Sequence, residues 1–239
     1  MRHLPAAPLV LAFVTALCMD AGGVGAQVPV SAKVGIDHLI IGVDDLARGM
    51  AEFERRTGVR PVKGGVHPGR GTQNALVSLG DGQYVEIMAP SHEPGTPSDD
   101  PRTRFSALTP VGWALHTEDL AGVVTALRTA GLDVSGITPG ARARPDGRRL
   151  EWQTASVMGD GLHSAPFFIA WGRNTPHPSS ESPTGCRLTR LAMAEPSPAT
   201  LQRFLDLSGV RVRVTQAAKV GMTIVLQCPA GAVTFGALD

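Results

Sequence analysis

The stretch GGVHPGRGTQNALVSLGDGQYVEIMAP, residues 64–90, carries the densest chemistry of the chain and predicts its central hairpin. Two strand-like runs, Asn74–Leu79 and Gln83–Met88, are joined by Gly-Asp-Gly, which is a strong β-hairpin signal. Alternation along the second run gives one face to three side chains: Tyr84, Glu86 and Met88. Glu86 therefore interrupts an apolar strand. A buried carboxylate is costly unless a metal ion, a cation or hydrogen-bond donors compensate it.

A strand is predicted at residues 59–63. A loop bounded by a proline and rich in glycine, HPGRGT at residues 67–72, follows it and precedes this hairpin. Such a loop lets the backbone approach a ligand closely, and His67 in it is suited to be a metal ligand or a general base. Three polar side chains are candidates for orienting a substrate: Arg70, Thr72 and Asn74. The structural alternatives are that His67 and these residues satisfy the backbone of a turn, and that Glu86 pairs with Arg70 or a lysine.

The composition bounds the class of protein. With 239 residues, 43% of them hydrophobic and 18% charged, the chain can form one large or two small domains with a real core. A net charge of +1 favours neither nucleic acid nor an anionic membrane as a partner, and 5% aromatic residues argue against a platform for stacking bases. The sequence contains no nucleophile elbow, phosphate loop, dinucleotide fingerprint or CxxC pair.

The N-terminus predicts export. Arg2 precedes an apolar run, Leu9–Met19, that is too short to span a bilayer but suits the core of a signal peptide. Small residues before Gln27 predict cleavage after residue 26, with a second candidate site at Ala32. The signal peptide would occupy residues 1–26, and the mature protein would be periplasmic or secreted, with no membrane association. Cys18 as a lipid attachment site is the weaker alternative.

Two cysteines, Cys186 and Cys228, would remain after cleavage. In an oxidising compartment they can form one disulfide. Two buried free thiols are an equally consistent interpretation, because the sequence alone does not show their separation in space.

The chain repeats a strand–helix–strands pattern. Residues 36–43 read as a strand that places His38 and Ile40 on the face opposite Leu39 and Ile41. The segment DDLA at residues 44–47 then begins a helix, and EDLA at residues 118–121 occupies the same place after a second strand at residues 112–117. We therefore predict two repeated units, residues 34–90 and 110–172. The basic segment at residues 142–149 reads as a solvated turn rather than an anion clamp.

Residues 173–186 are predicted to be a linker, rich in proline and serine, and residues 187–239 a third, partial unit. In the third unit Ser197-Pro198 is a helix-start signal, and strands are expected at residues 210–215, 222–228 and 232–235. His92 and His177 lie in proline-rich loops and are expected at the surface. Trp113 and Trp171 are expected in the core or lining a substrate cavity.

These features resemble the vicinal-oxygen-chelate superfamily, the glyoxalase, bleomycin-resistance and extradiol-dioxygenase type, and are most similar to its glyoxalase-like branch. The segments that carry the resemblance are DHL at 37–39, GGVHPGRGTQN at 64–74, YVE at 84–86 and PFFIAW at 166–171. The resemblance implies an α+β fold in which repeated βαβββ units form a half-open, curled mixed β-sheet barrel with the helices outside.

The resemblance also implies a divalent metal ion on the concave face, either Zn, Mn, Fe, Ni or Co. By position, His38 and Glu86 match metal ligands from the first and last strands of unit one, and His67 could supply a third. Unit two offers no counterpart, because Gly112 stands where His38 would be expected and residues 168–170 contain no carboxylate. His116 and His163 are weaker candidates.

Three functions remain open at this point. The first is an exported metal-dependent lyase, isomerase or dioxygenase acting on a small oxygenated metabolite, with Glu86 and His67 as catalytic groups and substrate bound by Arg70, Thr72, Asn74, Trp113 and Trp171. The second is a protein that binds or sequesters a small molecule without metal or turnover. The third is an assembly role, since the third unit leaves a sheet edge that could pair with another copy in a homodimer.

Overall fold

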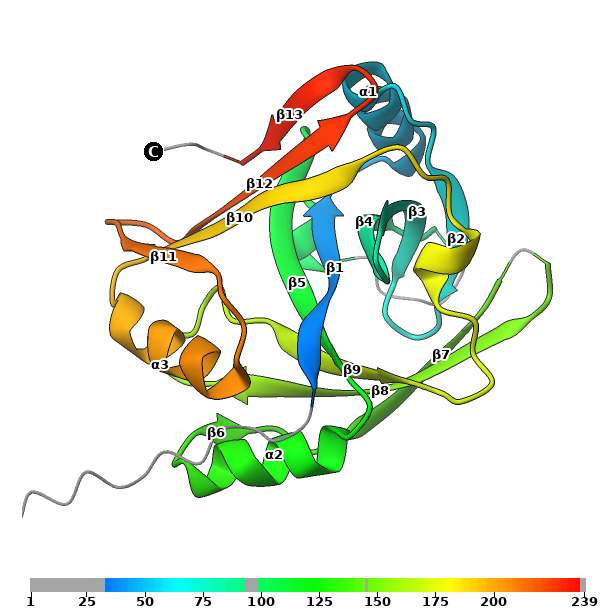
Figure 1. Cartoon of the computed structure of the whole chain (residues 1–239). Coiled ribbons are helices and arrows are strands. Elements are labelled where there is room, and N and C mark those ends of the chain that lie inside the picture. The colour runs from blue at the N-terminus through cyan, green and yellow to red at the C-terminus, as the bar shows by residue number, and fades with distance from the viewer. Residues whose placement is uncertain (1–32, 93–98, 145, 237–239) are drawn as a thin grey trace, which may run out of the picture.

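The computed structural model describes residues 33–92, 99–144 and 146–236 (Figure 1). The predicted signal peptide and Cys18 lie outside these residues. Within them, no helix is both long and apolar enough to cross a membrane.

Unit one has the predicted βαβββ order, and its elements are β1 (Val34–Gly42), α1 (Leu46–Thr57), β2 (Val62–His67), β3 (Thr72–Gly80) and β4 (Gln83–Pro90). The helix begins where the sequence indicates, because the Asp45 side chain accepts a hydrogen bond from the backbone N–H of Arg48. It ends at Gly58, whose φ of 76° is the left-handed conformation that glycine adopts without strain.

Unit two repeats this order with one additional short strand. After the 3-10 turn η1 (Pro101–Thr103) come β5 (Thr109–Thr117), α2 (Leu120–Thr129), β6 (Asp133–Val134), β7 (Thr138–Ala143), β8 (Arg149–Met158) and β9 (Phe167–Trp171). Asp119 caps α2 as Asp45 caps α1, by accepting from the backbone N–H of Gly122. The repeated acidic-Asp-Leu-Ala segments therefore mark two equivalent helix starts.

The two units join into one mixed sheet. Its strand order is β2-β3-β4-β1-β5-β9-β8-β6, and β7 pairs with β8. In each unit the first strand pairs in parallel with the last, β1 with β4 and β5 with β9, and the antiparallel pair β1–β5 connects the units. The outer strands β2 and β7 approach each other, and the Arg142 side chain of β7 donates to the carbonyl of Gly64 in β2. The α+β fold with a curled, half-open mixed sheet is confirmed.

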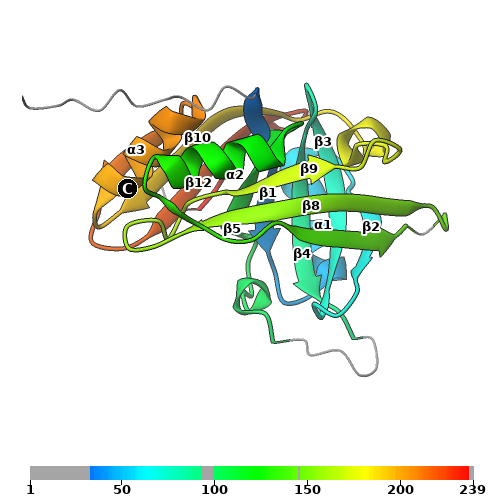
Figure 2. The same cartoon turned by 90° about the horizontal axis from the view of Figure 1, so that it is seen from below.

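The helices cover one face of this sheet. α1 packs on β3 and β4, and α2 packs on β8 and β9 (Figure 2). Alternation along β1 sends Leu39 and Ile41 into the core on this face, while His38 and Ile40 face the concave side. The concave face is therefore free to form a binding site.

The third segment adds a second sheet that shares the same core. Its elements are the 3-10 turn η2 (Pro178–Glu181), β10 (Arg187–Glu195), α3 (Pro198–Ser208), β11 (Arg213–Gln216), β12 (Gly221–Cys228) and β13 (Gly231–Phe235). The strand order is β11-β10-β12-β13, so β10 pairs in parallel with the first strand after its helix rather than the last. Phe53 of α1 stacks on Phe235 at 5.5 Å between ring centroids, and Phe168 of β9 meets Phe204 of α3 edge-on at 5.8 Å.

Three local predictions differ from the structure. The strand expected at residues 59–63 is β2 at 62–67, so His67 ends a strand instead of lying in the loop. The basic segment expected to be a solvated turn contributes Arg142 to β7, where it is only 5% exposed. The linker contains η2 and packs against β3 and β4, because it covers a part of the sheet that would otherwise be open.

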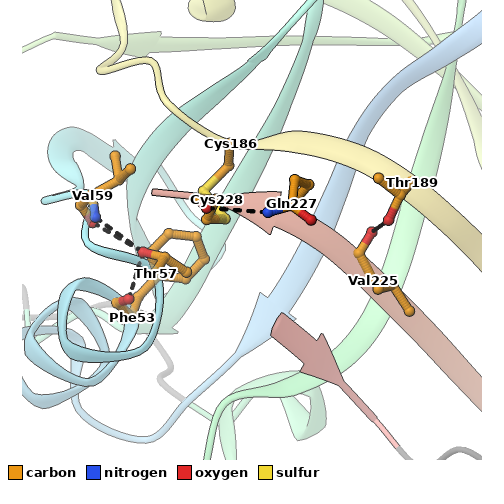
Figure 3. The surroundings of a disulfide bond; sticks show 8 residues. All are labelled: Phe53, Thr57, Val59, Cys186, Thr189, Val225, Gln227 and Cys228. Atoms are coloured by element: carbon orange, nitrogen blue, oxygen red, sulfur yellow. Dashed lines mark hydrogen bonds between the residues drawn. A yellow bond between two sulfur atoms is a disulfide. The ribbon is translucent and has the colours of Figure 1, made fainter. Parts of the chain in front are cut away.

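Cys186 and Cys228 form a disulfide, which decides between the two interpretations that the sequence left open (Figure 3). It joins the residue before β10 to the end of β12, beside the C-terminal end of α1. There the backbone N–H of Ala230 donates to the carbonyl of Thr57 at 3.1 Å. The disulfide therefore cross-links β10 and β12 of the second sheet, and the hydrogen bond from Ala230 to Thr57 connects this end of the sheet to unit one.

Candidate functional site

A cavity of about 70 Å³ opens on the concave face of the large sheet. β1, β2, β3, β4, β7, β8 and β9 all contribute side chains to it. All but one of the site residues predicted from the sequence line this cavity: His38, His67, Arg70, Thr72, Asn74, Glu86 and Trp171. The face predicted for the second strand of the hairpin is confirmed, since Tyr84, Glu86 and Met88 all line it.

Glu86 is the centre of the site. It lies beside Ile40 of β1 and Leu76 of β3 in the sheet and is 6% exposed. Its Oε1 lies 3.4 Å from Nε2 of His67, and its Oε2 lies 3.6 Å from Nε2 of His38. Asn74 donates a hydrogen bond to Oε1 at 2.7 Å. Two imidazoles from β1 and β2 thus converge on one carboxylate from β4.

The hydrogen-bond network assigns the tautomers of these histidines. His38 Nδ1 lies 2.6 Å from the buried carboxylate of Asp37, which can only accept, so Nδ1 carries the hydrogen. The Asn74 amide nitrogen that bonds Glu86 also faces Nε2 of His67 at 3.3 Å, while Nδ1 of His67 faces Thr72 Oγ1 at 2.8 Å. Both Nε2 lone pairs therefore point toward the Glu86 carboxylate.

This arrangement favours a proton or a cation between its members. Two nitrogen lone pairs and an ionised carboxylate repel one another at 3.4–3.6 Å unless a proton or a cation lies between them. The Oδ1 atom of Asn74 is a further buried acceptor with no partner among the described residues. The site therefore offers an excess of acceptors to a cation.

The pKa shifts of Glu86 and His67 agree with a site that attracts a cation. Burial opposes ionisation of Glu86, but the charges of His67 and His38, the Asn74 hydrogen bond and Arg142 outweigh it and lower the pKa of Glu86 below its usual value. Burial, together with the positive charges of Arg142, Arg70 and Arg102, lowers the pKa of His67 despite the attraction of Glu86. The site thus favours the carboxylate form of Glu86, while burial opposes protonation of His67.

Asp37 supports the site through contacts with three side chains. It is fully buried and accepts hydrogen bonds from His38, from Trp171 Nε1 at 2.9 Å and from His177 Nε2 at 3.1 Å. Burial raises its pKa, but the bonds and charges of His177 and His38 dominate and place the pKa far below its usual range. A carboxylate that orients a histidine in this way fixes which ring nitrogen faces the cavity.

Comparison with protein families identifies the chain. The model of the glyoxalase-like domain matches residues 36–207, which include both repeated units and extend into α3. The chain belongs to the glyoxalase-like domain family. It is thus a member of the vicinal-oxygen-chelate superfamily, as the resemblance in the sequence implies. No curated protein matches the chain.

The chain is also similar to solved structures. A crystal structure of a hypothetical protein from Staphylococcus aureus aligns with a TM-score of 0.60 and 17% identity over 85% of each chain. Streptomyces coelicolor methylmalonyl-CoA epimerase in complex with 2-nitronate-propionyl-CoA aligns with a TM-score of 0.43 and 18% identity, over 56% of this chain and 95% of the epimerase. The epimerase from Mycobacterium tuberculosis aligns with a TM-score of 0.37 and 20% identity, over 57% of this chain and 86% of that one.

The donors of the glyoxalase-like site suit a divalent metal ion by chemistry. Imidazole nitrogen and carboxylate oxygen are the usual ligands of Zn, Mn, Fe, Ni and Co. The carboxylate behind His38 is the common support of a metal-binding histidine. In the described part of the chain, however, no three His, Cys, Asp or Glu side chains form a ready metal cluster. His38 and His67 lie near different oxygens of Glu86.

Trp113 is the site residue that the structure corrects. Successive residues of β5 alternate in direction, so Trp113 turns into the core and is 1% exposed, with Nε1 donating to the Ser164 carbonyl at 2.8 Å. It borders a separate cavity of about 360 Å³ between β5 and β12, not the cavity around Glu86.

Of the remaining histidines, His177 is the one for which the sequence prediction is wrong. It comes from the presumed linker, yet it bonds Asp37 beneath the site. His116 lies 3.7 Å from the same carboxylate, and His163 lies 3.3 Å from Glu195, away from the cavity. His92 is exposed, as expected.

Sequence reasoning missed Asp37, Arg142 and Trp152 as members of this region. Asp37 carried a signal, because an acidic residue directly before an inward histidine interrupts an apolar strand. Arg142 and Trp152 carried none, since their strands reach the cavity only through the curl of the sheet.

Proposed function

We propose that this glyoxalase-like protein is a divalent-metal-dependent enzyme acting on a small oxygenated molecule, in the manner of a lyase, isomerase or dioxygenase. One observation carries the proposal: the Nε2 atoms of His38 and His67 converge on the carboxylate of Glu86 in a buried, acceptor-rich cavity. His38, His67 and Glu86 would hold the metal. When bound, it would polarise a substrate oxygen as a Lewis acid.

The chain's own residues supply the acid–base chemistry. Glu86 is ionised, so either of its oxygens can accept a proton from a substrate carbon or hydroxyl group. If His67 is not a metal ligand, its Nε2 would act as the base that takes and returns the proton. Asp37 binds Nδ1 of His38 and so aims Nε2 at the cavity. Tyr84, which stacks on His38 at 4.7 Å between ring centroids, and Phe167 make the cavity wall apolar and limit access of water.

Metal content tests the proposal. Purified mature protein, stripped and reconstituted separately with Zn, Mn, Fe, Ni and Co, is expected to retain about one ion per chain for at least one metal. Glu86→Gln is expected to retain less than about a tenth of that, because the amide removes the anionic ligand while preserving size. The measurement is elemental analysis after gel filtration.

The matched control is Glu151→Gln on β8, whose side chain is exposed and pairs with Arg149. It should retain the metal as the wild type does. Failure of all five ions to bind the wild-type protein would sink the metal-dependent function.

A second function has one observation in its favour. β5 and β9 of unit two give the cavity no His, Asp or Glu, and β9 contributes Phe167, Ile169 and Trp171 instead. A binding protein of the same fold, without metal or turnover, would have such a wall. It would bind its small molecule equally well before and after chelation of metals.

We also propose that the protein is exported to the periplasm or the outside of the cell. The apolar run at residues 9–19 supports this, and the Cys186–Cys228 bond suits an oxidising compartment. The expected result is a mature N-terminus at or near Gln27, measured by N-terminal sequencing of the protein from fractionated cells. An uncleaved protein that still begins at residue 1 and is found in the cytoplasmic fraction would contradict export. Light scattering on the same sample would test the predicted homodimer.

A further inference from the structure

Arg142 is a buried cation without an acidic partner. Its side chain is 5% exposed, and its Nη1 donates to the carbonyl of Gly64. None of the ion pairs formed among residues 33–92, 99–144 and 146–236 includes it. Glu86 stabilises its charge from a distance, yet burial still lowers the pKa of Arg142. A guanidinium has five N–H donors, so most of those on Arg142 remain available to a ligand.

The glycine pair at residues 64–65 forms a seat for this guanidinium. A Cβ atom on Gly64 would lie 2.3 Å from Oδ1 of Asn74 and 3.1 Å from Nη2 of Arg142. One on Gly65 would lie 2.6 Å from the carbonyl oxygen of Ala143 and 3.0 Å from Nη1 of Arg142. Gly65 also has a φ of 142°, which side chains rarely adopt. Unit one thus leaves space on β2 for a side chain that arrives from β7 of unit two. The guanidinium that occupies this seat is part of the cavity wall.

The cavity has an excess of positive charge around this position. Arg70 and Arg102 also line it, and Glu86 is its only acidic lining residue among those described. Asp100 neutralises Arg102 through contacts of 2.7 and 3.0 Å. The two positive charges of Arg142 and Arg70 are then balanced by a single negative charge, that of Glu86. A bound divalent metal would increase this excess. The field therefore favours an anionic ligand.

The volume limits the size of that ligand. One buried water needs roughly 10–15 Å³ of such space, so about 70 Å³ suits a molecule of about five or six non-hydrogen atoms. We propose that the site takes a small 2-oxo or 2-hydroxy carboxylate, with its carboxylate on Arg142 and its neighbouring oxygen toward Glu86 and the two histidines. This inference deepens the proposed function and rests on it for the role of the second oxygen.

The test compares an anion with its neutral analogue. Pyruvate and hydroxyacetone differ chiefly in the carboxylate, and their binding to metal-loaded wild-type protein is measured by calorimetry. Pyruvate is expected to bind at least tenfold more tightly. Arg142→Gln is expected to weaken pyruvate binding by about 10- to 100-fold and to change hydroxyacetone binding by less than about threefold, because only the charge-assisted bonds are lost.

Two further variants separate recognition from folding. Arg142→Lys keeps the charge but lacks the planar fork of the guanidinium. Its preference for pyruvate over hydroxyacetone should therefore fall between those of the wild type and Arg142→Gln. If Arg142→Gln does not fold, Arg142→Lys replaces it in the test. Arg149→Gln, from the exposed part of the same hairpin, should behave as the wild type. Equal weakening of both ligands in Arg142→Gln and Arg142→Lys would mean that Arg142 only closes the sheet, and would overturn the inference.

The outcomes also distinguish this inference from the proposed function. Metal content is measured on the same samples. If the wild type binds no metal but still prefers pyruvate through Arg142, the metal-dependent function fails and the anion site stands. If it binds metal but binds pyruvate no better than hydroxyacetone, or binds no pyruvate, the anion site fails alone.

Discussion

Replacing Asp37 with asparagine is expected to destabilise the protein by about 3–5 kcal/mol, because it breaks a buried, charge-assisted network. Asp37 accepts from His38, Trp171 and His177, and it is fully buried. Asparagine has one acceptor oxygen and an NH₂ group, so an N–H would face another N–H in the core. The measurement is urea unfolding at pH 7, followed by tryptophan fluorescence.

The effect of Asp37→Asn on the free energy of unfolding is also expected to depend on pH. The pKa of Asp37 is lowered in the folded protein, so its contribution is fully present above the ordinary carboxyl pKa of about 3.9. That contribution is lost as the pH falls below this value toward the folded pKa. The difference in unfolding free energy between wild type and Asp37→Asn should therefore shrink below about pH 4. Asp160→Asn, at an exposed turn, should change stability by less than about 0.5 kcal/mol.

A difference below about 1 kcal/mol for Asp37→Asn at pH 7 would show that the network contributes little to the fold. If the proposed metal function holds, the variant should also bind the metal about 10- to 100-fold more weakly, since His38 loses the group that orients it. This second effect is measured by metal titration on the folded fraction.

Removing the disulfide with the double substitution Cys186→Ser and Cys228→Ser is expected to cost about 4 kcal/mol. The bond closes a loop with a sequence separation of 42 residues, and the chain-entropy relation assigns about that much to a loop of this length. The loss should raise the entropy of the unfolded chain and loosen the second sheet, in which the disulfide links β10 to β12. Urea unfolding of the oxidised wild type and the double variant measures the difference.

Wild-type protein reduced with dithiothreitol is the control and should unfold at the urea concentration of the double variant. A double variant as stable as the oxidised wild type would show that packing alone fixes the second sheet. The substituted residues lie outside the cavity, so metal content should stay at the wild-type level while the protein is folded.

The strands and helices of the two units could be predicted because their signals are local. Alternation of apolar residues set the faces of β1 and β4, and therefore the inward direction of His38 and Glu86. Asp45, Gly58 and Asp119 marked helix ends through their own side chains or backbone. The strand at 59–63 was placed too early because Gly64 and Gly65 weaken the strand pattern, although both belong to β2 and pack closely against Asn74, Ala143 and Arg142.

The residues that close the site could not be predicted for a different reason. Arg142 reads as part of a basic turn, and His177 as part of a polar linker, because nothing near them in sequence shows what they approach. Arg142 meets Gly64 across 78 positions, and His177 meets Asp37 across 140. For Trp113 the sequence left the core and the cavity wall open, and the structure places it in the core.

The sequence alone determined the repeated βαβββ pattern, the glyoxalase-like family and the three side chains that meet at the site centre, since strand alternation and helix capping act over a few residues. The tertiary structure alone decided how that centre is supported, charged and closed: Asp37 behind His38, the disulfide beside α1, and Arg142 on its glycine seat. These features depend on how the twisted sheet curls and on which distant segments it brings together. Because the charges of Asp37 and Arg142 are buried, their electrostatic interactions are stronger than they would be in water.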